Sequence, residues 1–235
     1  MKRRSQSASR RIESEAERAG PALFEGLAES DVRAILDKST RTDFPSRSWL
    51  YRQGETSQRF CLVESGLVRL SQITPEGDDV LVRLVKPGEV FGYFAIALGG
   101  PNIVSAQAIQ PSRLAVWETA IMLHLMHCFP GLAENLFNIV ARDVAYFYDR
   151  IRRLQTQGVG RRVVWALAEL ARIIGKATPV GIVISHGLAQ RTLSELAGTT
   201  IYTVSRELTK LQQVGILQKK RGRIVVLHPD KLIDS

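Results

Sequence analysis

The chain has 235 residues, 45% of them hydrophobic, which is enough for one large domain or two small domains with separate cores. No apolar run is long enough to cross a membrane, and the basic, Ser-rich N-terminus lacks the apolar segment of a secretory signal. The two cysteines, Cys61 and Cys128, form neither a disulfide framework nor a C-x-x-C pair. We therefore expect a reduced, cytoplasmic protein.

Charge is distributed unevenly along the chain, whose net charge is +9. Residues 150–235 contain 15 Lys and Arg against 5 Asp and Glu, a net +10. Residues 19–149 contain 11 against 15, a net −4, and residues 1–18 contain 6 against 3, a net +3. Basic charge concentrated on one domain is what contact with nucleic-acid phosphates requires, so the C-terminal third is the part expected to face DNA.

The first residues predict a tail and a helix. Residues 1–20 are polar and basic without a sustained apolar pattern, which indicates a mobile tail. Residues 22–38 carry apolar side chains at helical spacing, and Ser30 is expected to cap a helix over residues 31–38.

From residue 41 to residue 118 the pattern changes to short strands separated by turn residues. Thr74-Pro75-Glu76-Gly77, for example, fits a β-turn with Pro at its second position. Many short strands at regular spacing predict a sandwich or jelly roll. The runs with strand character are 49–51, 60–63, 66–73 and 80–85.

Two helices follow the strands. Residues 118–129 are apolar, and Pro130 both breaks this helix and opens a longer one. In the longer helix, apolar residues recur at alternating spacings of four and three, which is the heptad seam of a two-stranded coiled coil. A helix packed only on its own roll is the alternative, but the strict alternation favours a partner helix. The seam consists of Ala133, Phe137, Val140, Val144, Phe147, Ile151 and Leu154.

Residues 157–160 contain two glycines and indicate a break between domains, followed by an apolar helix and a short strand at 181–184. A pair of short helices is then predicted over residues 188–211. Gly198 ends the first helix because glycine adopts the left-handed conformation without strain. Thr199 or Thr200 can cap the second helix.

The second helix of this pair has a polar, cationic outer face that suits a DNA major groove. An ordinary amphipathic hairpin of helices is the alternative interpretation. The basic residues 218–227 favour DNA binding, because they read as two strands around an Arg221-Gly222 turn, placed to meet phosphates.

Residues 193–206, LSELAGTTIYTVSR, together with the basic hairpin, resemble the winged helix-turn-helix of the CRP/FNR regulators. Gly54, Gly66 and the run 87–92 stand where the β-roll of that family has its turn glycines. The resemblance implies an α+β fold: a jelly-roll or β-roll sensor domain, a long dimerisation helix and a C-terminal winged helix-turn-helix. The expected divisions are a tail (1–20), a β-roll (21–129), the dimerisation helix (130–157) and the DNA-binding domain (158–235).

The same resemblance implies a homodimeric transcription regulator that binds double-stranded promoter DNA and works with RNA polymerase. An effector bound in the roll would re-aim the two recognition helices. The residues expected to contact DNA are Thr200, Ile201, Tyr202, Thr203, Ser205, Arg206, Lys210, Lys219 and Arg221. Among them Arg206 matches a family arginine that reads a base, whereas Ile201 and Tyr202 replace an Arg-Glu pair.

The effector pocket departs from the cyclic-nucleotide members of the family. Their Gly-Glu pair falls here at Gly92-Tyr93, next to Phe94, and their Arg-Ser pair falls at Val104-Ser105. Without the arginine a buried phosphate would be poorly compensated, so we expect neither cyclic AMP nor cyclic GMP as effector. The effector stays unidentified, and a cyclic-nucleotide-responsive regulator remains the alternative.

Haem-based or thiol-based sensing is a further alternative. His124 and His127 lie beside Cys128 as His-x-x-His-Cys, and either histidine is a weak candidate ligand for haem or zinc. Two cysteines do not supply an iron–sulfur cluster, and no cofactor is required by the sequence. An enzyme is not expected, because no G-x-S-x-G, P-loop or motif-spaced carboxylate pair occurs. A ligand-sensing regulatory subunit that does not bind DNA is another alternative. The predicted helix-turn-helix and the basic C-terminal third argue against it.

Overall fold

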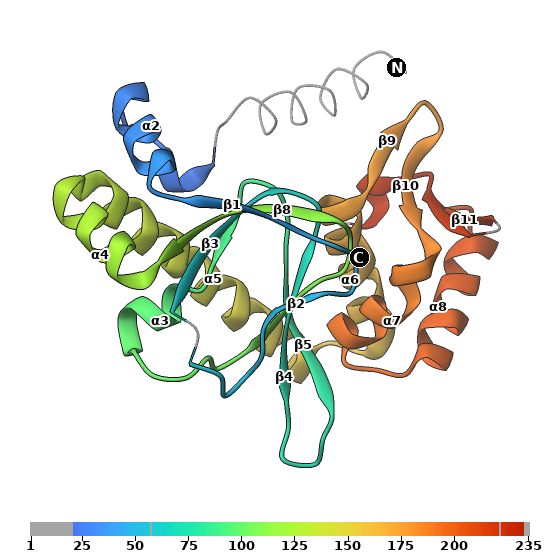
Figure 1. Cartoon of the computed structure of the whole chain (residues 1–235). Helices are drawn as coiled ribbons and strands as arrows, with labels where there is room; N and C mark the ends of the chain where they lie inside the picture. Colours follow the sequence, from blue (N-terminus) through green and yellow to red (C-terminus); the bar gives the residue numbers. More distant parts are fainter. Residues whose placement is uncertain (1–20, 57, 221, 233–235) are drawn as a thin grey trace. The chain divides into compact units, whose positions relative to one another are not determined.

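The computed structural model describes residues 21–56, 58–220 and 222–232. Its described residues form two compact units, one made of residues 21–70 and 85–143 and the other of residues 71–84 and 144–232. Figure 1 labels their helices and strands. The predicted tail of residues 1–20 lies outside the described part of the chain. Within that part, no helix is both long and apolar enough to cross a membrane.

The roll consists of two four-stranded sheets, with strand orders β1-β8-β3-β6 and β2-β7-β4-β5. The pairs β1–β8, β3–β8, β3–β6 and β2–β7 are antiparallel, as in the pairing of Cys61 on β3 with Val116 on β8. The strands are β1 Thr40–Phe44, β2 Trp49–Tyr51, β3 Arg59–Ser65, β4 Val68–Ile73, β5 Asp79–Val85, β6 Val90–Phe91, β7 Ser105–Ala108 and β8 Ser112–Glu118.

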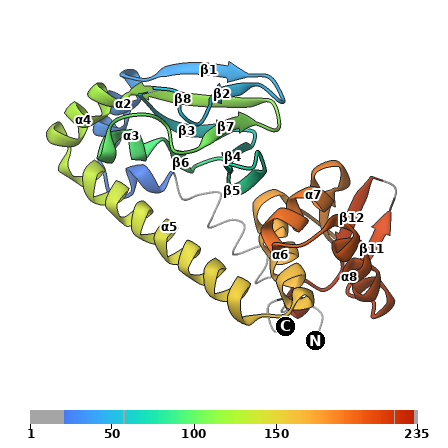
Figure 2. The same cartoon turned by 90° about the horizontal axis from the view of Figure 1, so that it is seen from below.

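Helices cover one end of the roll and share its core. Trp117 of β8 is fully buried, its ring lies 6.0 Å from that of Phe60, and its indole nitrogen donates to the Ile35 carbonyl at 2.9 Å. Leu132 and Leu136 of the long helix reach the same core. The helices are η1 Ala22–Phe24, α2 Glu29–Asp37, α3 Tyr93–Leu98, α4 Thr119–Cys128 and α5 Pro130–Thr156, the last visible along its length in Figure 2.

The winged helix follows α5. Its sheet has the order β11-β12-β10-β9, and its apolar centre includes Leu167, Leu193, Leu208 and Ile224, all fully buried. Its elements are α6 Val159–Ile174, β9 Lys176–Thr178, β10 Gly181–Ser185, α7 His186–Ala197, α8 Ile201–Gln213, β11 Leu217–Lys220, β12 Arg223–Val226 and η2 Pro229–Leu232.

The expected α+β fold of roll, long helix and winged helix-turn-helix is confirmed. The turn glycines take left-handed backbone conformations, and at Gly66 a Cβ would overlap residues 111 and 112. The predicted β-turn at Thr74 is present, with the Gly77 amide donating to the Thr74 carbonyl at 2.9 Å.

Some local predictions were wrong. Ser30 does not cap α2, because the helix already begins at Glu29 and Ser30 Oγ donates to the Asp31 side chain at 3.4 Å. The break at residues 157–160 is shorter than expected, since α6 begins at Val159 with Gly158 as its N-cap. The short helix α3 was not predicted from the sequence; its six residues lie between Gly92 and Gly99.

Candidate nucleic-acid interface and effector loop

The predicted helix-turn-helix is present as α7 and α8. Gly198 ends α7 with φ +58°, and the Thr199 amide donates to the Ser194 carbonyl at 3.0 Å. Thr200 is the N-cap of α8, where its Oγ1 accepts from the Thr203 amide at 3.2 Å. Val204 is fully buried on the inner side of α8, so the opposite face of this helix is free.

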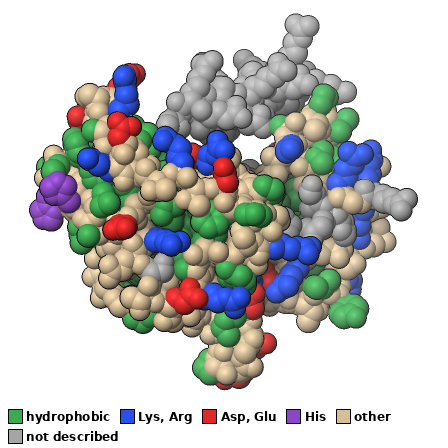
Figure 3. All heavy atoms as spheres, in the orientation of Figure 1, with side chains coloured by type: hydrophobic (Ala, Val, Ile, Leu, Met, Phe, Trp, Pro, Cys, Tyr) green, Lys and Arg blue, Asp and Glu red, His purple; other side chains and the backbone are tan. Residues whose placement is uncertain are grey.

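The outer face of α8 presents most of the predicted contact residues. The side chain of Tyr202 is 89% exposed, and Arg206 extends into solvent with only Glu207, at 3.5 Å, as an ion-pair partner among the described residues. Lys210 Nζ also pairs with Glu207, at 2.9 Å. Thr200, Ile201, Tyr202, Arg206 and Lys210 are exposed, and Thr203 and Ser205 are half-buried. Figure 3 shows Lys and Arg side chains over the winged helix.

The wing is the antiparallel pair β11 and β12, in which Lys220 faces Arg223 in register. Lys219 Nζ donates to Thr209 Oγ1 at 2.8 Å and to the Ser205 carbonyl at 3.4 Å, and its contact with DNA stays a prediction. This lysine therefore fastens the wing to α8. Lys220 and Arg223 are exposed cations of the wing that were not among the predicted contact residues. Arg221 lies outside the described residues.

The end of α5 and the start of α6 hold the turn between α7 and α8. Arg162 donates to the Leu154 carbonyl at 3.1 Å and to the Gly198 carbonyl at 3.3 Å. A Cβ on Gly198 would lie only 2.8 Å from a methyl group of Leu154. Gly198 thus serves both the left-handed turn and the close approach of the long helix, and Leu154 contacts the helix-turn-helix of its own chain.

The long helix has two apolar faces. One packs on the roll through Leu132 and Leu136, and Val140 of the predicted seam also touches that core. The other is open to solvent: Phe137 is 73% exposed, and Val144, Ile151 and Leu154 are exposed as well. Ala133 and Phe147 are half-buried. An exposed apolar stripe of this kind on a single chain marks an interaction surface.

Three of the predicted effector residues, Gly92, Tyr93 and Phe94, lie at the start of α3, and Ser105 begins β7. Gly92 has φ +88°, and a Cβ there would overlap the carbonyl oxygen of Arg59. Tyr93, where cyclic-nucleotide binders carry Glu, donates its hydroxyl proton to Asp143 Oδ2 of α5 at 2.7 Å. Phe94 is exposed, Val104 is half-buried, and buried Ser105 accepts from the Gln53 amide at 2.9 Å. Tyr93 therefore joins the start of α3 to the long helix directly.

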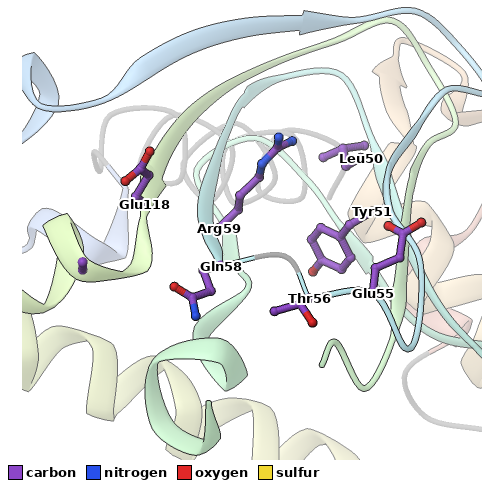
Figure 4. A pocket seen from close by; sticks show the side chains of 8 residues that line it. Leu50, Tyr51, Glu55, Thr56, Gln58, Arg59 and Glu118 are labelled. Atoms are coloured by element: carbon purple, nitrogen blue, oxygen red, sulfur yellow. The ribbon is translucent and has the colours of Figure 1, made fainter. Parts of the chain in front are cut away.

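A cavity of about 520 Å³ lies beside this loop and contains none of the five predicted pocket residues. Its wall includes Tyr51, whose ring is 6.2 Å from that of Phe91, the residue before Gly92. Figure 4 shows Arg59 between Glu118 on one side and Tyr51 and Glu55 on the other. The lining is polar and of mixed charge, and consists of Leu50, Tyr51, Glu55, Thr56, Gln58, Arg59, Glu118 and Ala120.

His124, His127, Cys61 and Cys128 are not among the residues that line this cavity. His124 Nε2 is 3.5 Å from Cys128 Sγ on the exposed side of α4, and His127 Nδ1 is 2.7 Å from the Leu123 carbonyl. No three His, Cys, Asp or Glu side chains in the described ranges are grouped closely enough for a metal ion. Cys61 is buried in β3, and burial raises the pKa of its thiol to about 12, so its thiolate is disfavoured.

Comparison with known proteins finds two domains in the chain. Residues 41–127 match the cyclic nucleotide-binding domain, and residues 161–235 match the Crp-like helix-turn-helix domain. The chain is 30% identical to a cyclic AMP receptor protein of Thermus thermophilus, over 88% of this chain and 93% of that protein. It is 24% identical to a CRP-like cAMP-activated global transcriptional regulator of Mycobacterium tuberculosis, over 92% of this chain and 95% of that one.

The fold is also found among solved structures. A transcriptional regulator of the CRP/FNR family from Thermus thermophilus shares it with a TM-score of 0.70 and 26% identity, over 83% of this chain and 99% of that one. These relatives are transcription regulators and not enzymes, in agreement with the absence of a catalytic motif from the sequence.

Proposed function

The chain belongs to the CRP/FNR family of transcription regulators, and from this premise we propose that it is a homodimer that binds promoter DNA in a sequence-specific manner. The observation that carries the proposal is the α8 face, where the side chains of Tyr202 and Arg206 are exposed. The proposed partners are double-stranded promoter DNA, a second copy of the chain and RNA polymerase. A promoter-binding protein of a bacterial family works in the cytoplasm, where its DNA is.

The proposal assigns a role to each part of the chain. The roll of residues 21–129 receives an effector, the helix of residues 130–157 pairs with its partner, and residues 158–235 bind DNA. The exposed stripe of Phe137, Val144 and Ile151 supports pairing of the long helices, because helix-turn-helix proteins read two half-sites as dimers. A change in the roll would alter this pairing and re-aim the two α8 helices.

The full-length protein is expected to bind promoter DNA recovered by a genomic selection, with an affinity that depends on salt. Released counterions make the logarithm of the affinity fall linearly with the logarithm of salt concentration. A fluorescence-anisotropy titration at several salt concentrations measures both. A protein that is folded and dimeric but binds no DNA from a genomic selection would instead be a ligand-sensing subunit without a DNA target.

We propose that the effector is not cyclic AMP or cyclic GMP. Tyr93, at the position of the family's Glu, is bonded to Asp143, and Val104, at the position of the family's Arg, supplies no cation for a cyclic phosphate. Titration calorimetry with either nucleotide at millimolar concentration is expected to show no saturable heat. A micromolar binding site would overturn this part of the proposal and would restore the cyclic-nucleotide alternative.

The polar cavity beside α3 supports an effector with both hydrogen-bond donors and acceptors, because its wall offers carboxylates, a guanidinium and an amide. Thiol-based sensing is a second candidate, favoured by the exposed pair of Cys128 and His124 and not by buried Cys61. Mass spectrometry of co-purified ligands and the absorbance spectrum of the purified protein distinguish a bound metabolite, haem and an oxidised thiol.

A further inference from the structure

The hairpin of β4 and β5 carries a concentrated negative charge into the otherwise basic second unit. Residues 71–79, SQITPEGDD, contain Glu76, Asp78 and Asp79 and no basic residue. The turn is closed by the Thr74 amide, which donates to the Asp78 carbonyl at 2.9 Å. Figure 3 shows carboxylates at the tip of this hairpin. We call residues 74–82 the acidic hairpin; they fall in the same compact unit as the winged helix.

Arg150 of α5 ties the acidic hairpin to the first helix of the helix-turn-helix. Its Nη1 donates to the Val82 carbonyl at 2.9 Å, and its Nη2 donates to the Leu81 carbonyl at 3.1 Å and to the Glu195 carbonyl of α7 at 3.3 Å. The Glu195 carbonyl belongs to the last turn of α7, the negative end of the helix dipole, which favours a cation.

The hydrogen bonds of Arg150 stabilise this contact only modestly. The Arg150 Nε is buried without a hydrogen-bond partner among the described residues, and all three acceptors of the guanidinium are neutral carbonyls. A partly desolvated cation without a carboxylate partner contributes less than a buried ion pair of good geometry. The contact is therefore suited to being opened and closed.

Arg191 of α7 is held by carboxylates on both sides. Its Nη2 lies 3.7 Å from Asp79 Oδ2 of the acidic hairpin, and its Nε lies 3.0 Å from Glu195 Oε1. The side chain of Arg191 is 67% exposed, so it is accessible to an anion in solution. A DNA phosphate that approached α7 would compete with Asp79 for this guanidinium and would meet the charges of Glu76 and Asp78.

We propose that the acidic hairpin is an autoinhibitory element, which lowers DNA affinity by occupying Arg191 and repelling phosphates while Arg150 holds it against α7. The inference rests on the proposed DNA-binding function. Because β4 and β5 are strands of the roll, a shift of these strands moves the hairpin and changes the charge that DNA meets. By linkage, DNA binding releases the hairpin to the same extent that the hairpin opposes DNA binding.

The test neutralises the hairpin in the full-length protein. The triple variant Glu76→Gln, Asp78→Asn, Asp79→Asn is expected to bind promoter DNA about tenfold more tightly at low salt, and the gain is expected to fall toward zero near 1 M salt. The matched control Glu29→Gln, Asp37→Asn, Glu134→Gln makes the same change of charge at exposed positions of the other unit and is expected to change affinity far less.

Two further variants separate a local contact from a general charge effect. Arg191→Gln is expected to weaken DNA binding more in the triple variant than in the wild type, because only the freed guanidinium reaches a phosphate. Arg150→Met removes a positive charge, so an increase in affinity from this variant arises only from release of the hairpin. Circular dichroism checks that each variant is folded.

The outcomes are distinct. A wild-type protein that binds no DNA refutes the proposed function, and the autoinhibition with it. A wild-type protein that binds DNA while the triple variant equals it, or gains no more than the control, refutes the autoinhibition alone. Equal effects of Arg191→Gln in both backgrounds also refute it, because the hairpin would then not compete for Arg191.

Discussion

The Val144→Glu variant is expected to sediment as a monomer and to lose specific DNA binding. Val144 is exposed in the middle of the apolar stripe of α5, at a position that faces its own copy in a parallel pair of helices. Each dimer would then bury two carboxylates side by side without cations. A buried unpaired charge costs on the order of 3–5 kcal/mol, which weakens association by roughly a hundredfold to several thousandfold.

Ala145→Glu provides the control, because Ala145 is exposed on α5 but lies off the heptad seam. This variant gains the same charge on the same helix, yet it is expected to remain dimeric. Sedimentation velocity at micromolar concentration measures both proteins. A dimeric Val144→Glu protein, or equal dissociation of the two variants, would mean that the stripe of α5 is not the dimer interface.

The order of elements was predictable from the sequence wherever the pattern was long or the turn residues were decisive. The long helix was placed from Pro130 onward because Pro opens helices and because the apolar spacing persisted over several turns. The helix-turn-helix was placed because Gly198 and Thr200 each fit one position of the turn. The wing followed from two short apolar–basic strands around a glycine.

Contacts between segments that are distant in sequence could not be predicted from the sequence. The bond of Lys219 to Thr209 depends on how the wing folds back onto α8, which no local pattern in the sequence shows. The seam residues Val140 and Leu154 also pack within their own chain, which a one-dimensional pattern does not separate from pairing with a partner. The hydrogen bonds of Arg150 to the carbonyls of Val82 and Glu195 join segments far apart in sequence, so no local sequence pattern predicts them.

We expect Arg206 of α8 to contact a base and the wing to contact phosphates. Arg206 is exposed near the middle of α8, and a guanidinium there can bond to O6 and N7 of a guanine. Arg206→Ala is expected to cost roughly 1–3 kcal/mol on the preferred half-site and to relax the preference at one guanine. Because Ile201 and Tyr202 replace the usual charged pair, the remaining bases should differ from those preferred by the family.

The wing provides the comparison. Lys220 is exposed on β11, and within the described part of the chain it has no hydrogen bond to α8. Lys220→Ala is therefore expected to weaken all sequences alike and to lower the salt slope by about one for each wing that contacts a phosphate. Lys219→Ala loses the hydrogen bond to Thr209 instead, so it is expected to reduce affinity while changing the salt slope less. Selections on randomised half-sites, combined with salt titrations of the three variants, measure both properties. Unchanged base preference in Arg206→Ala together with altered preference in Lys220→Ala would show that the wing, and not α8, reads the sequence.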